Sequence, residues 1–124
     1  MKSYTEKSLS KRKEERKDFP DFYKKHIDII KNNKECCKEC GIRLLGDVSE
    51  VAHILNKSYF KSVSINDDNV IYLCGWKQNN CHDKFDSGKE KEMKVFSIAK
   101  EKFNILKEEV KEKINYKIWD KYGN

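Results

Sequence analysis

Four cysteines in two separated pairs constrain the fold of this chain more than any other feature. Cys37 and Cys40 form a C-x2-C pair followed by Gly41, and Cys74 and Cys81 form a C-x6-C pair. Four thiolates from two such pairs make the tetrahedral ligand set of structural zinc. A glycine after the first pair lets the backbone turn so that its amides face the sulfurs. We therefore expect one structural Zn²⁺, held by all four cysteines.

Two details depart from a simple zinc knuckle. The six residues between the second pair of cysteines, 75–80, must bulge outward, because a tight knuckle holds fewer. Cys36 is a fifth cysteine that could pair with Cys40, but we interpret it as a spare thiol. The alternative to a zinc site is five reduced cysteines buried as small hydrophobic residues. Two separated pairs in a highly charged chain favour zinc.

Composition indicates why the fold should need a metal. The 124 residues suffice for one domain with appended helices, and 39% are charged against 37% hydrophobic. So thin a core usually requires a disulfide or a metal. With no secretory segment and no long apolar run, we expect a cytoplasmic protein, in a bacterial or phage-infected cell, without membrane association. In a reducing cytoplasm, C-x2-C spacing indicates zinc binding or redox chemistry.

The net charge of +6 is concentrated at the amino terminus, where residues 1–17 hold seven basic and three acidic residues. Such an excess favours a polyanionic partner, and DNA is the partner we expect. We interpret residues 1–19 as a basic arm and 20–124 as a single domain. The arm is either a solvated tail or a segment lying along phosphates. In the second case its contacts would come from Lys11, Arg12 and Lys13.

Short, irregular elements are predicted for the first two thirds of the domain. Apolar residues at helical spacing predict a short helix over 21–32, after Pro20. Strands at 42–45 and 48–55 are predicted to form a hairpin around a Gly-Asp turn. A loop, a short extended segment at 70–73 and a helix starting near residue 80 follow. The expected fold class is α+β, with its core at about 36–88.

From about residue 90 to 122 the pattern predicts one long helical extension, because its apolar residues step by three or four. The apolar stripe consists of Met93, Phe96, Ala99, Phe103, Leu106, Val110, Ile114 and Ile118. We expect this stripe to pack on the rest of the domain and on the helix over 21–32. A homodimer formed through the same stripe of the C-terminal helix is the alternative.

Polar residues surround the cysteines in a fixed order. The segments are AHILNKS (52–58), DDNVIYLC (67–74) and CHDKFDSG (81–88). Their order, together with the preceding C-x2-C, resembles the HNH family of ββα-metal nucleases. The resemblance covers about residues 36–88, less than half of the chain. It implies a small ββα-metal core with structural zinc, flanked by an N-terminal helix and a long C-terminal helix.

The resemblance also implies a role for each polar residue. His53, at the end of a strand, corresponds to the general base, and Asn69 to the asparagine that braces the loop carrying that base. His82, at the start of the following helix, corresponds to the ligand of a catalytic divalent ion. Asp86 would share that ion, which we expect to be Mg²⁺ or Mn²⁺.

Elementary chemistry agrees with these roles. Hydrolysis of a phosphodiester needs an activated water and stabilisation of the charge on the phosphate. Neutral imidazole has a pKa close to working pH, so His53 can take the proton of the water. His82 and Asp86 are four residues apart, so on a helix they share one face and can hold the same ion. His26, within an apolar helical pattern, is interpreted as structural.

One position departs from the family pattern. Many members carry an acidic or histidine ligand just before the general base, and this chain has Ala52. Glu50 would share the same side of a strand and could reach the ion. Otherwise water would fill that position.

Exposed basic and aromatic residues near the expected site are candidates for contact with nucleic acid. Trp76, within the insertion between Cys74 and Cys81, could stack on a base or wedge a groove, or it could cover the knuckle. Phosphate contacts by lysines would make binding depend steeply on salt. The lysine candidates are Lys57, Lys61, Lys77, Lys84 and Lys89.

These observations predict a metal-dependent DNA endonuclease or nickase, of a kind we associate with phages or mobile elements. A non-catalytic zinc-ribbon module that binds nucleic acid or a regulatory partner is the alternative. It accounts for the cysteines and the charge, but not for the placement of His53, Asn69 and His82. A toxin or defence effector with the same nuclease core is a third reading.

Overall fold

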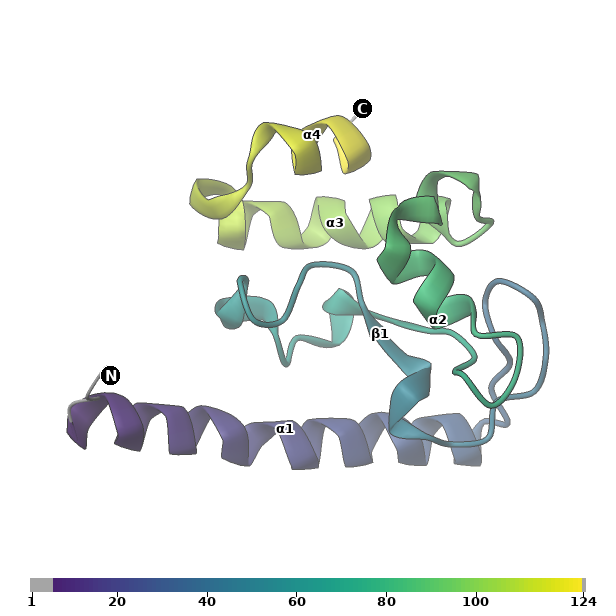
Figure 1. Ribbon diagram of the computed structural model, residues 1–124, viewed down its shortest axis with the longest axis horizontal. Helices are drawn as coiled ribbons and strands as arrows, with labels where there is room; N and C mark the ends of the chain where they lie inside the picture. Colours follow the sequence, from purple (N-terminus) through teal and green to yellow (C-terminus); the bar gives the residue numbers. More distant parts are fainter. Residues whose placement is uncertain (1–5, 124) are drawn as a thin grey trace.

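Three layers make up the part of the chain that the computed structural model describes, which is residues 6–123, with side chains described from Phe19 onward. Helix α1 lies along one side, a two-stranded sheet and its loops lie in the middle, and helices α3 and α4 cover the other side (Figure 1). Over these residues the fold is a small α+β arrangement of four α-helices and two antiparallel strands. The expected fold class is confirmed at this level.

Helix α1 spans Glu6–Asn32 and passes through Pro20. The prediction that this helix starts only after Pro20 was wrong. A proline inside a helix lacks an N–H and removes one hydrogen bond, but the segment before it is rich in Lys, Glu and Arg, which are good helix formers. The helix therefore continues on both sides. The side chains of Lys11, Arg12 and Lys13 lie outside the described residues.

The sheet pairs strand β1 (Val51–His53) with strand β2 (Val70–Tyr72) in antiparallel register. His53 lies opposite Val70. The predicted hairpin between 42–45 and 48–55 was wrong, since the partner of β1 comes from the segment predicted to be extended at 70–73. Arg43 instead forms an isolated bridge with Cys36.

Glu50 explains why the predicted hairpin does not form. Residues 48–50 make a single 3₁₀ turn, η1 (Val48–Glu50), and the Glu50 side chain is buried. Its carboxylate accepts hydrogen bonds from the backbone N–H groups of Leu45, Gly46 and Asp47, at 2.8, 2.7 and 2.8 Å. A buried carboxylate satisfied in this way closes the chain into a capped turn. Residues 45–50 therefore form a turn and cannot be part of a strand.

Turns of 3₁₀ type connect the two strands, at η2 (Lys61–Val63) and η3 (Asp67–Asn69). Helix α2 (Cys81–Lys84) follows β2 and continues into a wide π turn, η4 (Phe85–Lys89). A further 3₁₀ turn, η5 (Glu90–Glu92), leads into α3. The predicted start of a helix near residue 80 is confirmed.

The C-terminal extension is two helices and not one long helix, which corrects the prediction. Helix α3 (Phe96–Val110) ends at a 3₁₀ turn, η6 (Lys111–Lys113), and α4 (Tyr116–Tyr122) folds back beside α3 (Figure 1). Asn115 begins α4 by accepting a hydrogen bond from the Ile118 N–H at 3.0 Å. Aromatic packing holds the two helices together, because the Phe103 ring lies 5.4 Å from that of Tyr122.

Most of the predicted apolar stripe packs within the domain. Its residues in the middle of α3 are buried, and this helix contacts η2 and η3 in the loop between the strands. The buried members are Ala99, Phe103, Leu106 and Val110. Over the described residues, no helix has both the length and the apolar composition needed to cross a bilayer.

Glu50→Ala should destabilise the domain by about 3 kcal/mol, because three backbone N–H groups lose a charged acceptor. Urea unfolding at constant zinc concentration measures this change. The matched control is Glu92→Ala, at an exposed position in η5, which should change stability by less than ~0.5 kcal/mol. Equal midpoints for the two variants would contradict the assigned capping role.

Candidate active site and metal centre

The four predicted zinc ligands converge on one point. Cys37 and Cys40 come from the turn after α1, Cys74 follows β2, and Cys81 begins α2. Their sulfur atoms all lie within 4.8 Å of one another, and those of Cys40 and Cys74 are 3.8 Å apart. Tetrahedral Zn–S bonds of about 2.3 Å require sulfurs about 3.8 Å apart. The prediction of a four-cysteine cluster able to bind a metal is confirmed.

Backbone amides support the sulfurs as the C-x2-C-Gly pattern predicts. The Cys40 N–H donates to the sulfur of Cys37, and the Cys81 N–H donates to that of Cys74, both at 3.5 Å. Gly41 has φ +81°, which an L-residue rarely adopts. Cys36 is exposed and lies outside the cluster, as predicted.

The widened spacing of the second pair forms an outward turn. The amide of Asn79 returns from this turn to donate to the Cys40 sulfur at 3.3 Å. Burial raises the pKa of the Cys40 thiol, but hydrogen bonds from Asn79 and from the backbone near Ile42 outweigh it and lower the pKa to about 6. Trp76 is 70% exposed at this turn and so does not cover the cluster.

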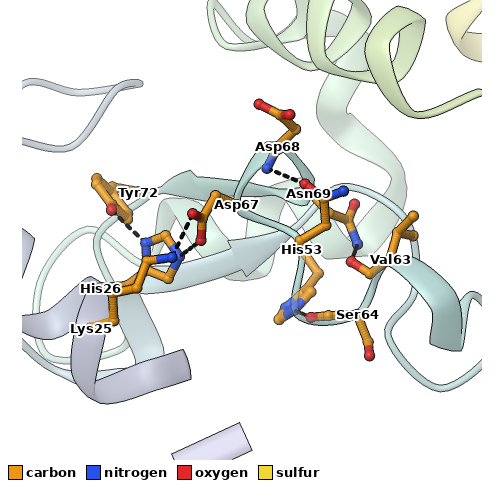
Figure 2. A network of polar contacts seen from close by, with 10 residues as sticks. Lys25, His26, His53, Val63, Ser64, Asp67, Asp68, Asn69 and Tyr72 are labelled. Atoms are coloured by element: carbon orange, nitrogen blue, oxygen red, sulfur yellow. Dashed lines mark hydrogen bonds and ion pairs between the residues drawn. The ribbon is translucent and has the colours of Figure 1, made fainter. Parts of the chain in front are cut away.

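His53 lies at the end of β1, the strand that contacts helix α1. Its Nε2 is 2.8 Å from the carbonyl oxygen of Ser64, which can only accept a hydrogen bond, so Nε2 carries the proton (Figure 2). The other ring nitrogen, Nδ1, is thereby left as the basic atom. Burial lowers the pKa of His53 more than the Ser64 contact raises it. Its neutral form is favoured.

Asn69 is completely buried and connects the two ends of the loop that follows His53. Its side-chain oxygen accepts from the Leu55 N–H at 2.7 Å. Its amide nitrogen donates to the carbonyl oxygen of Leu55 at 3.0 Å, and to that of Val63 at 3.2 Å (Figure 2). All of these groups belong to backbone on either side of the loop. Asn69 therefore sets the shape of the segment that ends at Ser64, the partner of His53.

His82 and Asp86 form a pair one helical turn apart. The Nδ1 atom of His82 is 2.6 Å from the carbonyl oxygen of Ser49, so Nδ1 carries a proton in either charge state, and Nε2 is free only when the ring is neutral. That Nε2 lies 3.0 Å from the Asp86 carboxylate. The hydrogen bond to Asp86 raises the pKa of His82. A carbonyl on one ring nitrogen and a free second nitrogen is the arrangement of metal-ligating histidines.

One cleft of about 590 Å³ is lined by His53, His82 and Asp86. The structure therefore brings together the predicted base and the predicted pair of ion ligands. Asn69 holds the loop that follows the base. Within the described residues, the four cysteines are the one converging group of three or more metal-ligating side chains. Glu50 does not reach this cleft as a ligand, because its carboxylate is turned onto the residues before η1. Ala52 is buried in the core.

Several residues of the cleft were not found by sequence reasoning. Tyr23 of α1 lines it, as do Glu90 and Lys121. Glu90 is 4% exposed and its carboxylate lies 2.8 Å from the Lys121 Nζ. No local signal predicts Lys121, because its position depends on α4 folding back onto α3. Tyr23 fits the apolar helical pattern over 21–32, which predicts a helix and gives no signal of a place in the cleft.

His26 belongs to a separate polar network (Figure 2). Its ring is buried, with Nδ1 2.6 Å from the Tyr72 hydroxyl and Nε2 2.9 Å from the Asp67 carboxylate. These contacts connect α1 to β2 and to η3. The arrangement agrees with the structural interpretation of this histidine.

The predicted DNA-binding lysines are spread over the surface. Among them, Lys57 lines the cleft. Lys77 lies 3.1 Å from the Asp47 carboxylate and 5.4 Å from the centre of the Trp76 ring. The remaining ones, all exposed and outside the residues that line the cleft, are Lys61, Lys84 and Lys89.

Comparisons with models of known protein families, with curated proteins and with solved structures find no match to this chain.

Cys40→Ser should lose stoichiometric zinc and unfold the domain, because a structural metal site contributes directly to folding. Metal analysis and thermal unfolding of the purified protein measure both effects. Cys36→Ser is the matched control, since it removes an exposed thiol outside the cluster and should keep zinc and stability. Full zinc retention by Cys40→Ser would refute the assignment.

Proposed function

We propose that this protein is a metal-dependent DNA endonuclease or nickase with an HNH-type ββα-metal core. The observation that carries the proposal is the shared cleft, in which His53 lies with the His82–Asp86 pair. The two histidines are oriented by backbone carbonyls through opposite ring nitrogens, which suits them to different tasks. One can accept a proton, and the other can bind an ion.

In the proposed mechanism, His53 is the general base. Its free Nδ1 takes a proton from the water that attacks the phosphodiester, while the Ser64 carbonyl holds the ring by its other nitrogen. Burial keeps the imidazole neutral and therefore able to act as a base. Asn69 acts indirectly, because it holds the loop that carries Ser64.

His82 and Asp86 would hold the catalytic Mg²⁺ or Mn²⁺. The donor set fits a divalent ion, because loss of the Nε2 proton of His82 leaves an imidazole lone pair and a carboxylate oxygen 3.0 Å apart. When bound, the ion supplies Lewis-acid stabilisation of the negative charge on the phosphate and on the departing oxygen. Since Glu50 is engaged elsewhere, water would complete the ligand set. A structural Zn²⁺ at the four cysteines would fix the start of α2 and hence His82.

DNA is the proposed substrate because the chain carries a net charge of +6. One such site hydrolyses one strand, so nicking is the expected primary activity. A double-strand break would require a homodimer or two successive encounters. A second candidate function is a non-catalytic zinc module that binds nucleic acid. The observation that favours it is Trp76, exposed beside Lys77 on the turn between two cysteines.

Supercoiled plasmid incubated with the protein and Mg²⁺ or Mn²⁺ should be nicked. His53→Ala should lower the rate by about a hundredfold or more, because the general base is lost. His82→Ala should keep zinc and lose activity, because the ion loses a ligand but the cysteines do not. Gel electrophoresis of the plasmid and metal analysis of each variant are the measurements.

Nicking by His53→Ala at the wild-type rate would contradict the proposal. Absence of metal-dependent nicking by the wild type, together with tight DNA binding, would favour the non-catalytic module. Gln78→Ala, at a position away from the cleft, serves as a variant expected to keep activity.

The pH profile tests the state of His53. Because burial holds its pKa below the ordinary value of 6.5, the neutral base should persist as pH falls through 6.5 and be lost only below it. The half-loss of activity at saturating metal should therefore come below pH 6.5. Saturation matters because Asp86 raises the pKa of His82, so that protons compete with the ion. NMR titration of the His53 ring is the direct check, and a midpoint at or above 6.5 would contradict this reading.

A further inference from the structure

Lys57 is held at one edge of the cleft by an aromatic platform on helix α1. Its Nζ donates to the Tyr23 hydroxyl at 2.9 Å. The same ammonium lies 5.3 Å from the centre of the Tyr23 ring and 5.6 Å from that of Phe19. Hydrogen bonding and cation–π attraction both restrain a side chain that is usually mobile.

The charge of Lys57 is not offset by an acid. Over the described part of the chain, no carboxylate pairs with Lys57 in an ion pair. The other lysine of the cleft, Lys121, is 2.8 Å from the buried carboxylate of Glu90. Among the described residues that line the cleft, Lys57 alone therefore offers a positive charge that is positioned and has no carboxylate partner.

Lys57 also lies close to the proposed base. The Tyr23 ring that holds it packs edge-on against His53, with 6.2 Å between ring centres. The positive charge of Lys57 contributes to the low pKa of His53. The ammonium and the imidazole are thus near neighbours on one wall of the cleft.

We propose that Lys57, held by Tyr23 and Phe19, forms the phosphate-binding subsite of the cleft beside His53. This inference rests on the proposed function and names the group that receives the phosphodiester. An ammonium has three N–H donors, and the Tyr23 hydroxyl takes one, so the others are free for phosphate oxygens. A cation already in place stabilises developing negative charge without reorganisation.

The subsite makes α1 part of the active site. Tyr23 is a positioning residue, because it acts on the phosphate only through Lys57. Removal of its hydroxyl should therefore lower kcat/KM when Lys57 is present and have no effect when Lys57 is absent. If Tyr23 were only structural, removal of its hydroxyl would lower kcat/KM equally with and without Lys57.

The test compares nicking rates of the full-length, zinc-loaded protein. Lys57→Met should lower kcat/KM by about a hundredfold, and Lys57→Arg should recover most of that loss. Tyr23→Phe should lower it by about tenfold, the size of one lost hydrogen bond, and should have no further effect in the Lys57→Met background. Matched controls are Lys24→Met, at the exposed neighbour of Tyr23 on α1, and Tyr116→Phe, at an exposed position of α4.

Binding of a short DNA duplex in EDTA supplies a readout that needs no catalysis. Fluorescence anisotropy over a series of salt concentrations should show weaker binding by Lys57→Met and a salt slope reduced by about one. Lys24→Met should bind as the wild type does.

The outcomes separate the two proposals. A wild type that nicks, with Lys57→Met indistinguishable from Lys24→Met in rate and salt slope, overturns the subsite and leaves the nuclease standing. A wild type that binds DNA without nicking, with the smaller salt slope in Lys57→Met, supports the subsite and overturns the nuclease. Equal losses from Tyr23→Phe in both backgrounds overturn the positioning role of Tyr23.

Discussion

At the four-cysteine cluster, the turn after α1, the end of β2 and the start of α2 meet at sulfurs within 4.8 Å of one another. A chain with slightly more charged than hydrophobic residues has little core with which to hold these segments. Metal–sulfur bonds are strong enough to do so. The cluster also sets the site, because His82 follows Cys81 directly and Cys74 lies two residues beyond the strand that pairs with β1. Both histidines of the cleft are thus attached to elements that the cluster fixes.

The orientation of each histidine comes from a backbone carbonyl. Ser64 contacts Nε2 of His53, and Ser49 contacts Nδ1 of His82, so the ring nitrogen not held by a carbonyl differs between the two histidines. Environment then separates them further. Burial disfavours the charged form of His53, whereas the neighbouring Asp86 favours the charged form of His82. Two identical side chains therefore differ in the chemistry available to them.

Helix α1 contributes more than a cover for the sheet. His26 anchors it through the Tyr72 hydroxyl and the Asp67 carboxylate, and burial lowers the pKa of this imidazole. The next turn toward the amino terminus carries Phe22 and Tyr23, whose rings lie 6.0 and 6.2 Å from that of His53. The hydrogen bonds of His26 at one turn of α1 thus position the Phe22 and Tyr23 rings at the next turn. Both rings pack against His53, and Tyr23 also holds Lys57.

Sequence alone determined the features that depend on residue type and short spacing. The four cysteines of the metal-binding cluster, the exclusion of Cys36 and the i, i+4 pair of His82 and Asp86 follow from local chemistry that holds in any compatible fold. The α+β class was predictable for the same reason. The proposed roles of His53 and Asn69 came from the order of motifs, and their carbonyl and loop contacts became visible only in three dimensions.

Tertiary structure decided what depends on contacts between distant segments. The Glu50 side chain binds the backbone of residues 45–47, so this segment forms a turn and β1 pairs with residues 70–72. The local propensity of residues 48–55 does not reveal this pairing. The Tyr122 ring packs on the Phe103 ring and so holds α4 beside α3, and the apolar stripe is divided between two helices. Lys57 meets Tyr23 from thirty-four residues away. Local sequence specifies which groups are present and which face of an element they share, whereas long-range packing selects the pairs that meet.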